Sequence, residues 1–120
     1  MSIVEELMQT ATSDTDLLRT LDGQGDDFSV PRDVDFLMRA PSQERAELVA
    51  NFINDNQYGV ATAEESGGKH SVNIVIRMPV QQHLALSVSG FMACVATLFG
   101  LDYDGWGCIA QKSAQHIVAE

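Results

Sequence analysis

Basic residues are scarce in this 120-residue chain. Seven Lys and Arg stand against 17 Asp and Glu, which gives a formal charge of −10. Such a surface repels phosphate backbones at every distance within a Debye length, so direct nucleic-acid binding is disfavoured. The same field attracts basic segments of other proteins and speeds encounter with them. We therefore expect a cationic protein as the partner.

Cysteine is also scarce. Cys94 and Cys108 form no CxxC pair and lack the dense, even pattern of small secreted scaffolds. We expect both to be free thiols, and Cys94, inside the apolar run 91–95, to be a small buried hydrophobe rather than a nucleophile.

Long apolar runs are missing from the pattern as well. No run approaches the roughly 18 residues of a spanning helix, and residues 1–7 lack the basic start and apolar stretch of a signal peptide. We therefore expect a cytoplasmic protein without membrane association.

Motifs that carry catalysis or bind metals are not found either. His70, His83 and His116 form no HExxH or HxH pair, and no acidic stretch matches an EF-hand loop. The Gly-rich turn 66–68 lies between two expected strands, whereas a phosphate-binding loop leads into a helix. We expect no catalytic residue, no metal and no other cofactor.

The N-terminal segment has helical periodicity, interrupted by the polar cluster 13–16, so it is either one helix or two. If its apolar stripe stayed exposed, it would indicate a homodimer. The following stretch is rich in Gly, Asp and Pro, which is typical of a loop. The expected organisation is a helical arm (1–21), an acidic Gly/Asp/Pro loop (22–32), a main domain (33–112) and a C-terminal tail (113–120).

The main domain switches repeatedly between strand and helix periodicity. Apolar and polar residues alternate most clearly over 71–78. Ser42 can cap one helix and Gly100 can end the other. The expected order is strand 34–38, helix 42–54, strand 58–64, strand 71–78, helix 84–99 and strand 101–111.

This β-α-β-β-α-β order is typical of a ferredoxin-like sandwich of the α+β class, in which two helices cover one face of four antiparallel strands. Right-handed crossovers place the first and third strands centrally. The edges are then 58–64 and 101–111, and an edge strand offers unpaired backbone groups to a partner. Because this fold hosts many unrelated functions, it decides none of them.

The segment 103–107, YDGWG, places the only Trp between two glycines. Glycines in a strand mark a bulge or a close approach of another backbone, and Trp is enriched at binding hot spots. Trp106 is therefore either a partner-binding anchor or a residue that closes the core beneath a helix. Its parity relative to Tyr103 favours a side chain facing away from the core, unless a bulge intervenes.

Two motifs resemble a known family. YDGWG at 103–107 follows the last expected helix, and GDDFSVPRDVDF at 25–36 leads into the first strand. Together they resemble the regulator of ribonuclease E activity B family, over a region from Thr20 to Gln111. The resemblance implies a small acidic bacterial protein with a ferredoxin-like sandwich. It also implies inhibition of the endonuclease ribonuclease E by binding to its non-catalytic scaffold, without enzymatic activity of its own.

We hypothesise a non-catalytic regulator whose acidic face engages a basic segment of ribonuclease E. Two alternatives stay open: an interaction module for another basic protein, such as a toxin, and a small-ligand-sensing or enzymatic domain. A pocket with convergent polar groups and a perturbed titratable residue would support the ligand-binding alternative, and a flat acidic sheet face would count against it. The expected partner-binding residues are Asp102, Asp104 and Trp106, with Asp26 and Asp27.

Overall fold

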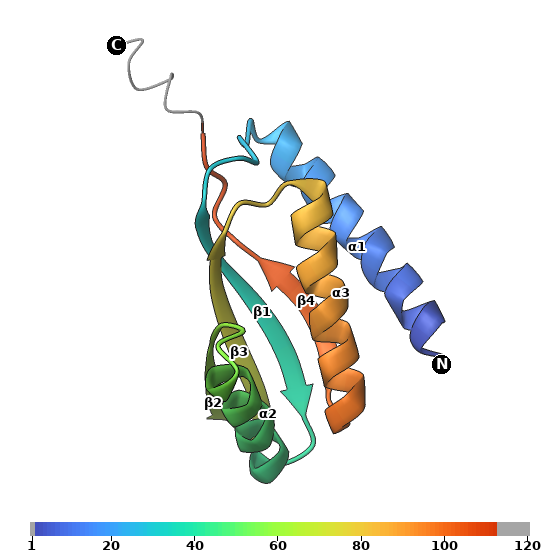
Figure 1. The fold of residues 1–120 in the computed structure, drawn as a ribbon, viewed down its shortest axis with the longest axis vertical. Coiled ribbons are helices and arrows are strands. Elements are labelled where there is room, and N and C mark those ends of the chain that lie inside the picture. The colour runs from blue at the N-terminus through green and yellow to red at the C-terminus, as the bar shows by residue number, and fades with distance from the viewer. Residues whose placement is uncertain (1, 113–120) are drawn as a thin grey trace.

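The computed structural model describes residues 2–112, which form a four-stranded antiparallel sheet and three helices (Figure 1). The α+β class and the expected order of elements are confirmed. The expected tail 113–120, which includes His116, lies outside the described residues. The elements are α1 (Ile3–Gly23), β1 (Arg32–Ala40), α2 (Gln43–Asp55), β2 (Val60–Ser66), β3 (Lys69–Met78), α3 (Gln82–Phe99) and β4 (Asp102–Gly107).

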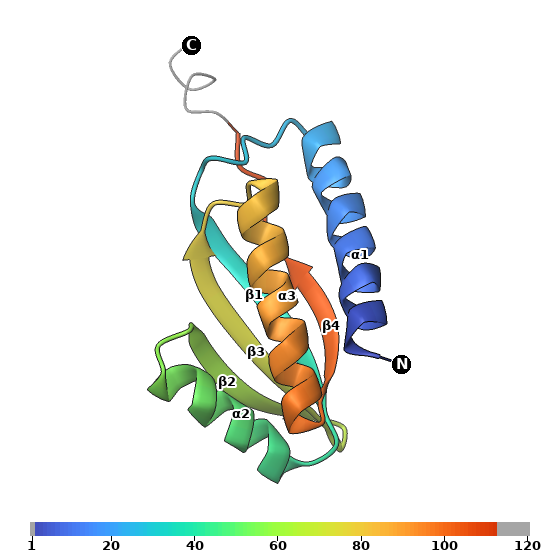
Figure 2. The ribbon, with the colours of Figure 1, turned by 45° about the vertical axis from the view of Figure 1, so that its right-hand side comes forward.

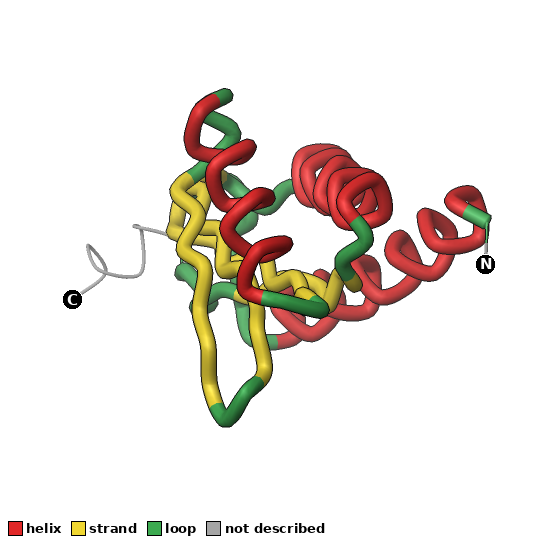
Figure 3. The backbone as a smooth tube through the Cα atoms, turned by 90° about the horizontal axis from the view of Figure 1, so that it is seen from below, coloured by secondary structure: helices red, strands yellow, loops and turns green. Residues whose placement is uncertain are grey.

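The sheet has the strand order β2-β3-β1-β4, so β1 and β3 are central and β2 and β4 are its edges. The expected central position of the first and third strands is therefore confirmed. The helices lie on one side of the sheet (Figure 3), where α2 packs on β2 and β3, and α3 packs on β4. The other side is left open by the described residues.

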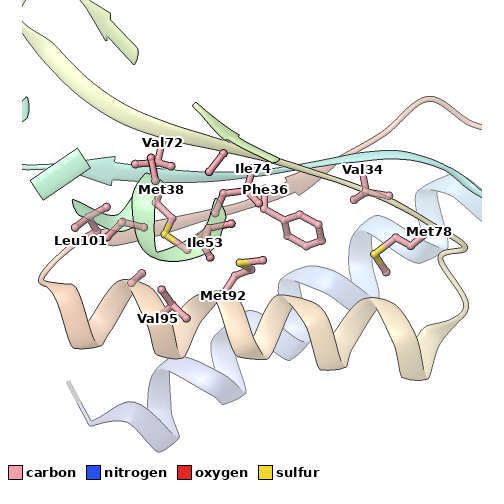
Figure 4. Packing of buried hydrophobic residues seen from close by; sticks show 14 of the residues in the cluster. Val34, Phe36, Met38, Ile53, Val72, Ile74, Met78, Met92, Val95 and Leu101 are labelled. Carbon is pink, nitrogen blue, oxygen red and sulfur yellow. The ribbon is translucent and has the colours of Figure 1, made fainter. Parts of the chain in front are cut away.

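Alternation along the strands builds the core between the sheet and the helices. In β1, Val34, Phe36 and Met38 point toward the helices and are buried, whereas Asp33 and Asp35 are exposed. Figure 4 shows these side chains above those of α3. Full burial of such a side chain contributes about 1.5–3 kcal/mol relative to exposure, so the period-2 pattern sets which face is covered.

The N-terminal arm is one continuous helix that packs along α3 (Figure 2). The Ser2 hydroxyl accepts a hydrogen bond from the Glu5 backbone N–H and caps its start. Leu18 and Leu21 are buried in the core, while Met8 near the other end is 66% exposed. The arm therefore packs on the main domain of the same chain, although part of its apolar stripe stays at the surface.

Helix α2 begins as expected, because the Ser42 hydroxyl accepts a hydrogen bond from the Arg45 backbone N–H. Val49 and Ile53 are buried against the sheet. Leu48, placed on the buried stripe by its spacing, is instead 49% exposed. The buried residues of α2 are Ala46, Val49, Ala50 and Ile53.

Helix α3 ends at Gly100, whose φ of 76° is the left-handed cap conformation that glycine favours. The expectation that no run approaches a spanning helix is too strong, since Gln82–Phe99 passes that test by length and composition. Met92 and Val95 lie on the side of this helix that faces the sheet, and both are buried in the core (Figure 4).

Candidate functional site

The YDGWG segment contains a β-bulge. Trp106 lies opposite Phe36 and Tyr103 lies opposite Met38, so three steps along β4 match two along β1. Gly105 adopts a φ of +90°, a conformation that favours glycine. The extra residue turns both aromatic side chains toward the helices. The parity preference for an outward Trp106 is therefore wrong, because the bulge intervenes.

Trp106 connects β4 to the N-terminal helix. Its partly buried ring packs against the core, and its indole N–H donates a hydrogen bond of 2.9 Å to Asp14 Oδ1. This geometry matches the alternative in which Trp106 closes the core beneath a helix. A direct contact between Trp106 and a partner stays a prediction.

Asp14 is the functional candidate that sequence reasoning missed. Asp14 is only 4% exposed, and its Oδ2 has no hydrogen-bond partner among the described residues. Nearby, Ser89 Oγ and Tyr103 Oη lie 2.7 Å apart. Burial raises the pKa of Asp14, against the opposing effects of Ser89 and Trp106, and burial likewise raises the pKa of Tyr103.

A signal for Asp14 was available in the sequence. The apolar residues Leu7, Ala11, Leu18 and Leu21 recur at spacings of three, four and seven, and Asp14 occupies the missing position of that stripe. A carboxylate at an apolar position of a packed helix is expected to be buried, and a buried carboxylate needs a partner.

The raised pKa of Asp14 predicts a pH dependence. Between pH 3.8 and the raised pKa, Asp14 binds more protons in the folded protein than in the unfolded chain. The stabilising effect of its protonation is therefore complete below pH 3.8. That effect is lost as pH rises through the folded pKa. Urea unfolding between pH 4 and 7 should therefore show wild type losing stability relative to Asp14→Asn.

The control for this prediction is Asp16→Asn, whose native side chain is 67% exposed and which should not reproduce the trend. A constant difference between wild type and Asp14→Asn would contradict the prediction.

A cavity of about 260 Å³ opens between α1, α3 and β4, and Asp14 and Tyr103 contribute to its wall. Its lining is mostly polar: it includes Glu6 from α1 and Thr97 from α3, and it contains no basic residue. Glu6 Oε2 accepts a hydrogen bond of 2.8 Å from the Thr97 hydroxyl. The cavity thus combines convergent polar groups with the perturbed carboxyl of Asp14.

Asp26 does not offer its charge to a partner, which corrects the expectation from the sequence. Its side chain is fully buried in an ion pair with Arg32, whose Nη2 lies 2.9 Å from Asp26 Oδ1. Arg32 also donates to the backbone oxygens of Asp27, Val30 and Ile109. The GDDFSVPR motif therefore ties its own loop to the segment after β4.

Asp27 keeps its carboxylate at the surface of the same loop. The backbone N–H and hydroxyl of Ser29 both donate to Asp27 Oδ1, and these hydrogen bonds lower the pKa of Asp27. Its backbone N–H donates to the Gln111 oxygen at 2.7 Å. Asp27 therefore stays negatively charged well into the acidic range.

Asp102 and Asp104 lie on the open side of the sheet, and both are exposed. Arg39 lies opposite Asp102, and its Nη2 is 2.9 Å from Asp104 Oδ2. Arg32 lies seven residues from Arg39 along β1, a separation of roughly 23 Å. The structure therefore brings Asp102 and Asp104 together but leaves the loop carrying Asp26 and Asp27 at the other end of the sheet.

Among residues 2–112, no group of three or more His, Cys, Asp or Glu side chains is arranged to hold a metal ion. Cys94 and Cys108 are both free thiols. Cys108 lies 4.0 Å from Arg32 Nη1, and burial raises the pKa of its thiol, which keeps it in the less reactive form.

A family model described as regulator of ribonuclease activity B matches residues 11–108. The matched region runs from the middle of α1 to just beyond β4, so it contains Asp14, the Asp26–Arg32 pair and the β4 bulge. A search of curated proteins found no match. The resemblance carried by the two motifs is confirmed, and the chain belongs to the regulator of ribonuclease activity B family, a family of regulatory proteins.

Proposed function

We propose that this protein is a non-catalytic regulator that binds ribonuclease E through the acidic open face of its sheet and so modulates RNA degradation. The observation that carries the proposal is the family match over residues 11–108, combined with a formal charge of −10. An acidic protein is suited to a basic, RNA-binding segment of a nuclease, because opposite potentials steer the two partners together.

The charges on the open face support this choice of surface. We define the open face by the outward-pointing side chains of the sheet, in which five carboxylates outnumber two arginines and one lysine. Isolated exposed pairs such as Arg39 with Asp104 contribute little to stability, so those carboxylates remain free to meet a partner. The charged residues of the open face are Asp33, Asp35, Glu64, Asp102 and Asp104, with Arg39, Lys69 and Arg77.

The same proposal includes a ferredoxin-like fold and a cytoplasmic location. The strand order β2-β3-β1-β4 with helices on one side supports a ferredoxin-like sandwich. A regulator of ribonuclease E would work in the bacterial cytoplasm. Another basic protein, such as a toxin, would use the same open face.

A ligand-binding role is the second candidate. The cavity beside Asp14 is the specific observation that favours it, since a polar pocket with a perturbed carboxyl is a common feature of binding sites. The exposed acidic sheet favours the regulator, and both features can serve one protein.

The regulator proposal predicts that charge reversal on the open face slows association. Asp102→Lys with Asp104→Lys should reduce the association rate with full-length ribonuclease E by about tenfold at low salt, with a smaller difference at high salt. Surface plasmon resonance over a salt series would measure this. Glu44→Lys with Glu47→Lys changes the net charge equally on exposed positions of α2, away from the open face. Equal slowing by both variants would show that only net charge matters, and undetectable binding of wild type would remove ribonuclease E as the partner.

A further inference from the structure

Among the described residues, Asp14 of the cavity between α1, α3 and β4 has a buried side-chain oxygen without a hydrogen-bond partner. Glu6 and Asp104 are reached by solvent, and they accept hydrogen bonds from Thr97 and Arg39. Asp14 Oδ1 accepts a hydrogen bond from Trp106, and the nearby Ser89 hydroxyl also lowers the pKa of Asp14, but Oδ2 has no partner within hydrogen-bond geometry among the described residues. Keeping this buried carboxylate ionised is costly, and a positive group from outside the chain would stabilise the ionised form.

The cavity has the size and the chemistry for a small cationic group. Its volume of about 260 Å³ lies just below the common range for drug-sized ligands, about 300–1,000 Å³. Lining residues that are exposed, such as Gln9 and Ser13, place its mouth at the surface, whereas Asp14 and Ala93 are buried. Because three lining residues are acidic and none is basic, the cavity disfavours an anion.

We propose that this cavity binds a single guanidinium or alkylammonium group, with Asp14 as the buried counter-charge and with Glu6 near it. The source of that group is the Arg or Lys side chain of a basic partner segment, a choice that rests on the proposed function. The cavity borders β4 through Tyr103 and Asp104, so a segment lying on the open face can reach it around that edge strand.

The position of Trp106 provides the readout. Trp106 is the only Trp, and its indole N–H donates to the same carboxylate that would meet the cation. In nuclear magnetic resonance spectra of the full chain, a single indole N–H resonance therefore reports on Asp14. The probes are n-butylguanidinium and n-butylammonium, with n-butanol as an uncharged molecule of similar chain length.

We expect a saturable shift of the Trp106 indole resonance with both cations and none with the alcohol. Asp14→Asn should weaken probe binding by about tenfold or more, because it removes the buried charge. Asp16→Asn removes the same charge from an exposed position of α1 and should change binding less than about twofold. No saturable shift, or equal weakening by the two variants, would overturn the proposal.

A second pair of variants covers the case in which Asp14→Asn fails to fold. Ser13→Lys places an ammonium group at the mouth of the cavity, at an exposed helical position, and should abolish probe binding. Thr12→Lys adds the same charge at an exposed position outside the lining and should leave binding largely intact. Retained binding in Ser13→Lys would contradict the assigned site.

The source of the cation is tested separately. A capped Gly-Arg-Gly peptide should bind more tightly than n-butylguanidinium if the cavity receives a side chain from a protein segment. Tighter binding of the free cation would overturn that source and indicate a small amine or guanidine ligand. None of these titrations contains ribonuclease E, so probe binding without ribonuclease E binding would remove the proposed function and keep the site.

Discussion

Replacing Arg32 by Ala is expected to lower the free energy of unfolding by about 3–5 kcal/mol, because the change leaves the Asp26 carboxylate buried without its partner. For a domain of this size that loss corresponds to a fall in melting temperature of roughly 10–20 °C. Arg32 also holds three backbone oxygens of its loop and of the segment after β4. Thermal and urea unfolding followed by circular dichroism would measure the effect.

Arg19→Ala is the matched control for this prediction. Arg19 pairs with Asp16 on the exposed surface of α1, with side-chain exposures of 77% and 67%, so its loss should cost less than about 0.5 kcal/mol. If Arg32→Ala were no more destabilising than Arg19→Ala, the buried pair would not be what fastens the GDDFSVPR loop.

Trp106→Ala is expected to cost about 3–4 kcal/mol of stability, because it removes a large packed ring and the hydrogen bond that satisfies Asp14 Oδ1. Trp106→Phe keeps most of the ring and should cost about 1–2 kcal/mol. Urea unfolding of both variants separates the packing effect from the hydrogen bond.

A double-mutant cycle tests the Trp106–Asp14 contact directly. Combining Trp106→Phe with Asp14→Ala should be less destabilising than the sum of the single changes by about 0.5–3 kcal/mol, as expected for residues in contact. Strict additivity would show that the indole N–H contributes nothing through Asp14.

The same Trp106 variants bear on partner binding. A structural role predicts that Trp106→Phe leaves the dissociation rate from ribonuclease E nearly unchanged. A partner-binding anchor predicts clearly faster dissociation with little loss of stability. Surface plasmon resonance beside the unfolding data distinguishes the two roles.

Local patterns in the sequence were sufficient to predict the type and order of the elements, although the last strand, expected over 101–111, ends at Gly107. The alternation through Val34, Phe36 and Met38 and the helical stripe ending at Gly100 reflect which side chains each element must bury, and that requirement acts over a few residues. The prediction of burial was weaker for α2. Leu48 has the spacing of the buried residues, but it is exposed because the sheet covers only one side of the helix.

The candidate site depended on contacts between distant parts of the chain. Asp26 was expected to bind a partner, but in the folded chain its side chain is buried against Arg32, which also contacts the segment after β4. Asp14 and Trp106 are 92 positions apart, so no local pattern pairs them.

By itself, the sequence determined the α+β class, the order of the elements, the net acidity and, through YDGWG and GDDFSVPR, the family. Only the tertiary structure decided that Trp106 faces inward, that Asp26 is buried and that Asp14 borders a cavity. The physical reason is that these outcomes depend on strand register and helix docking. A single bulged residue at Gly105 reverses the face of every side chain beyond it, so periodicity alone could not reveal the site.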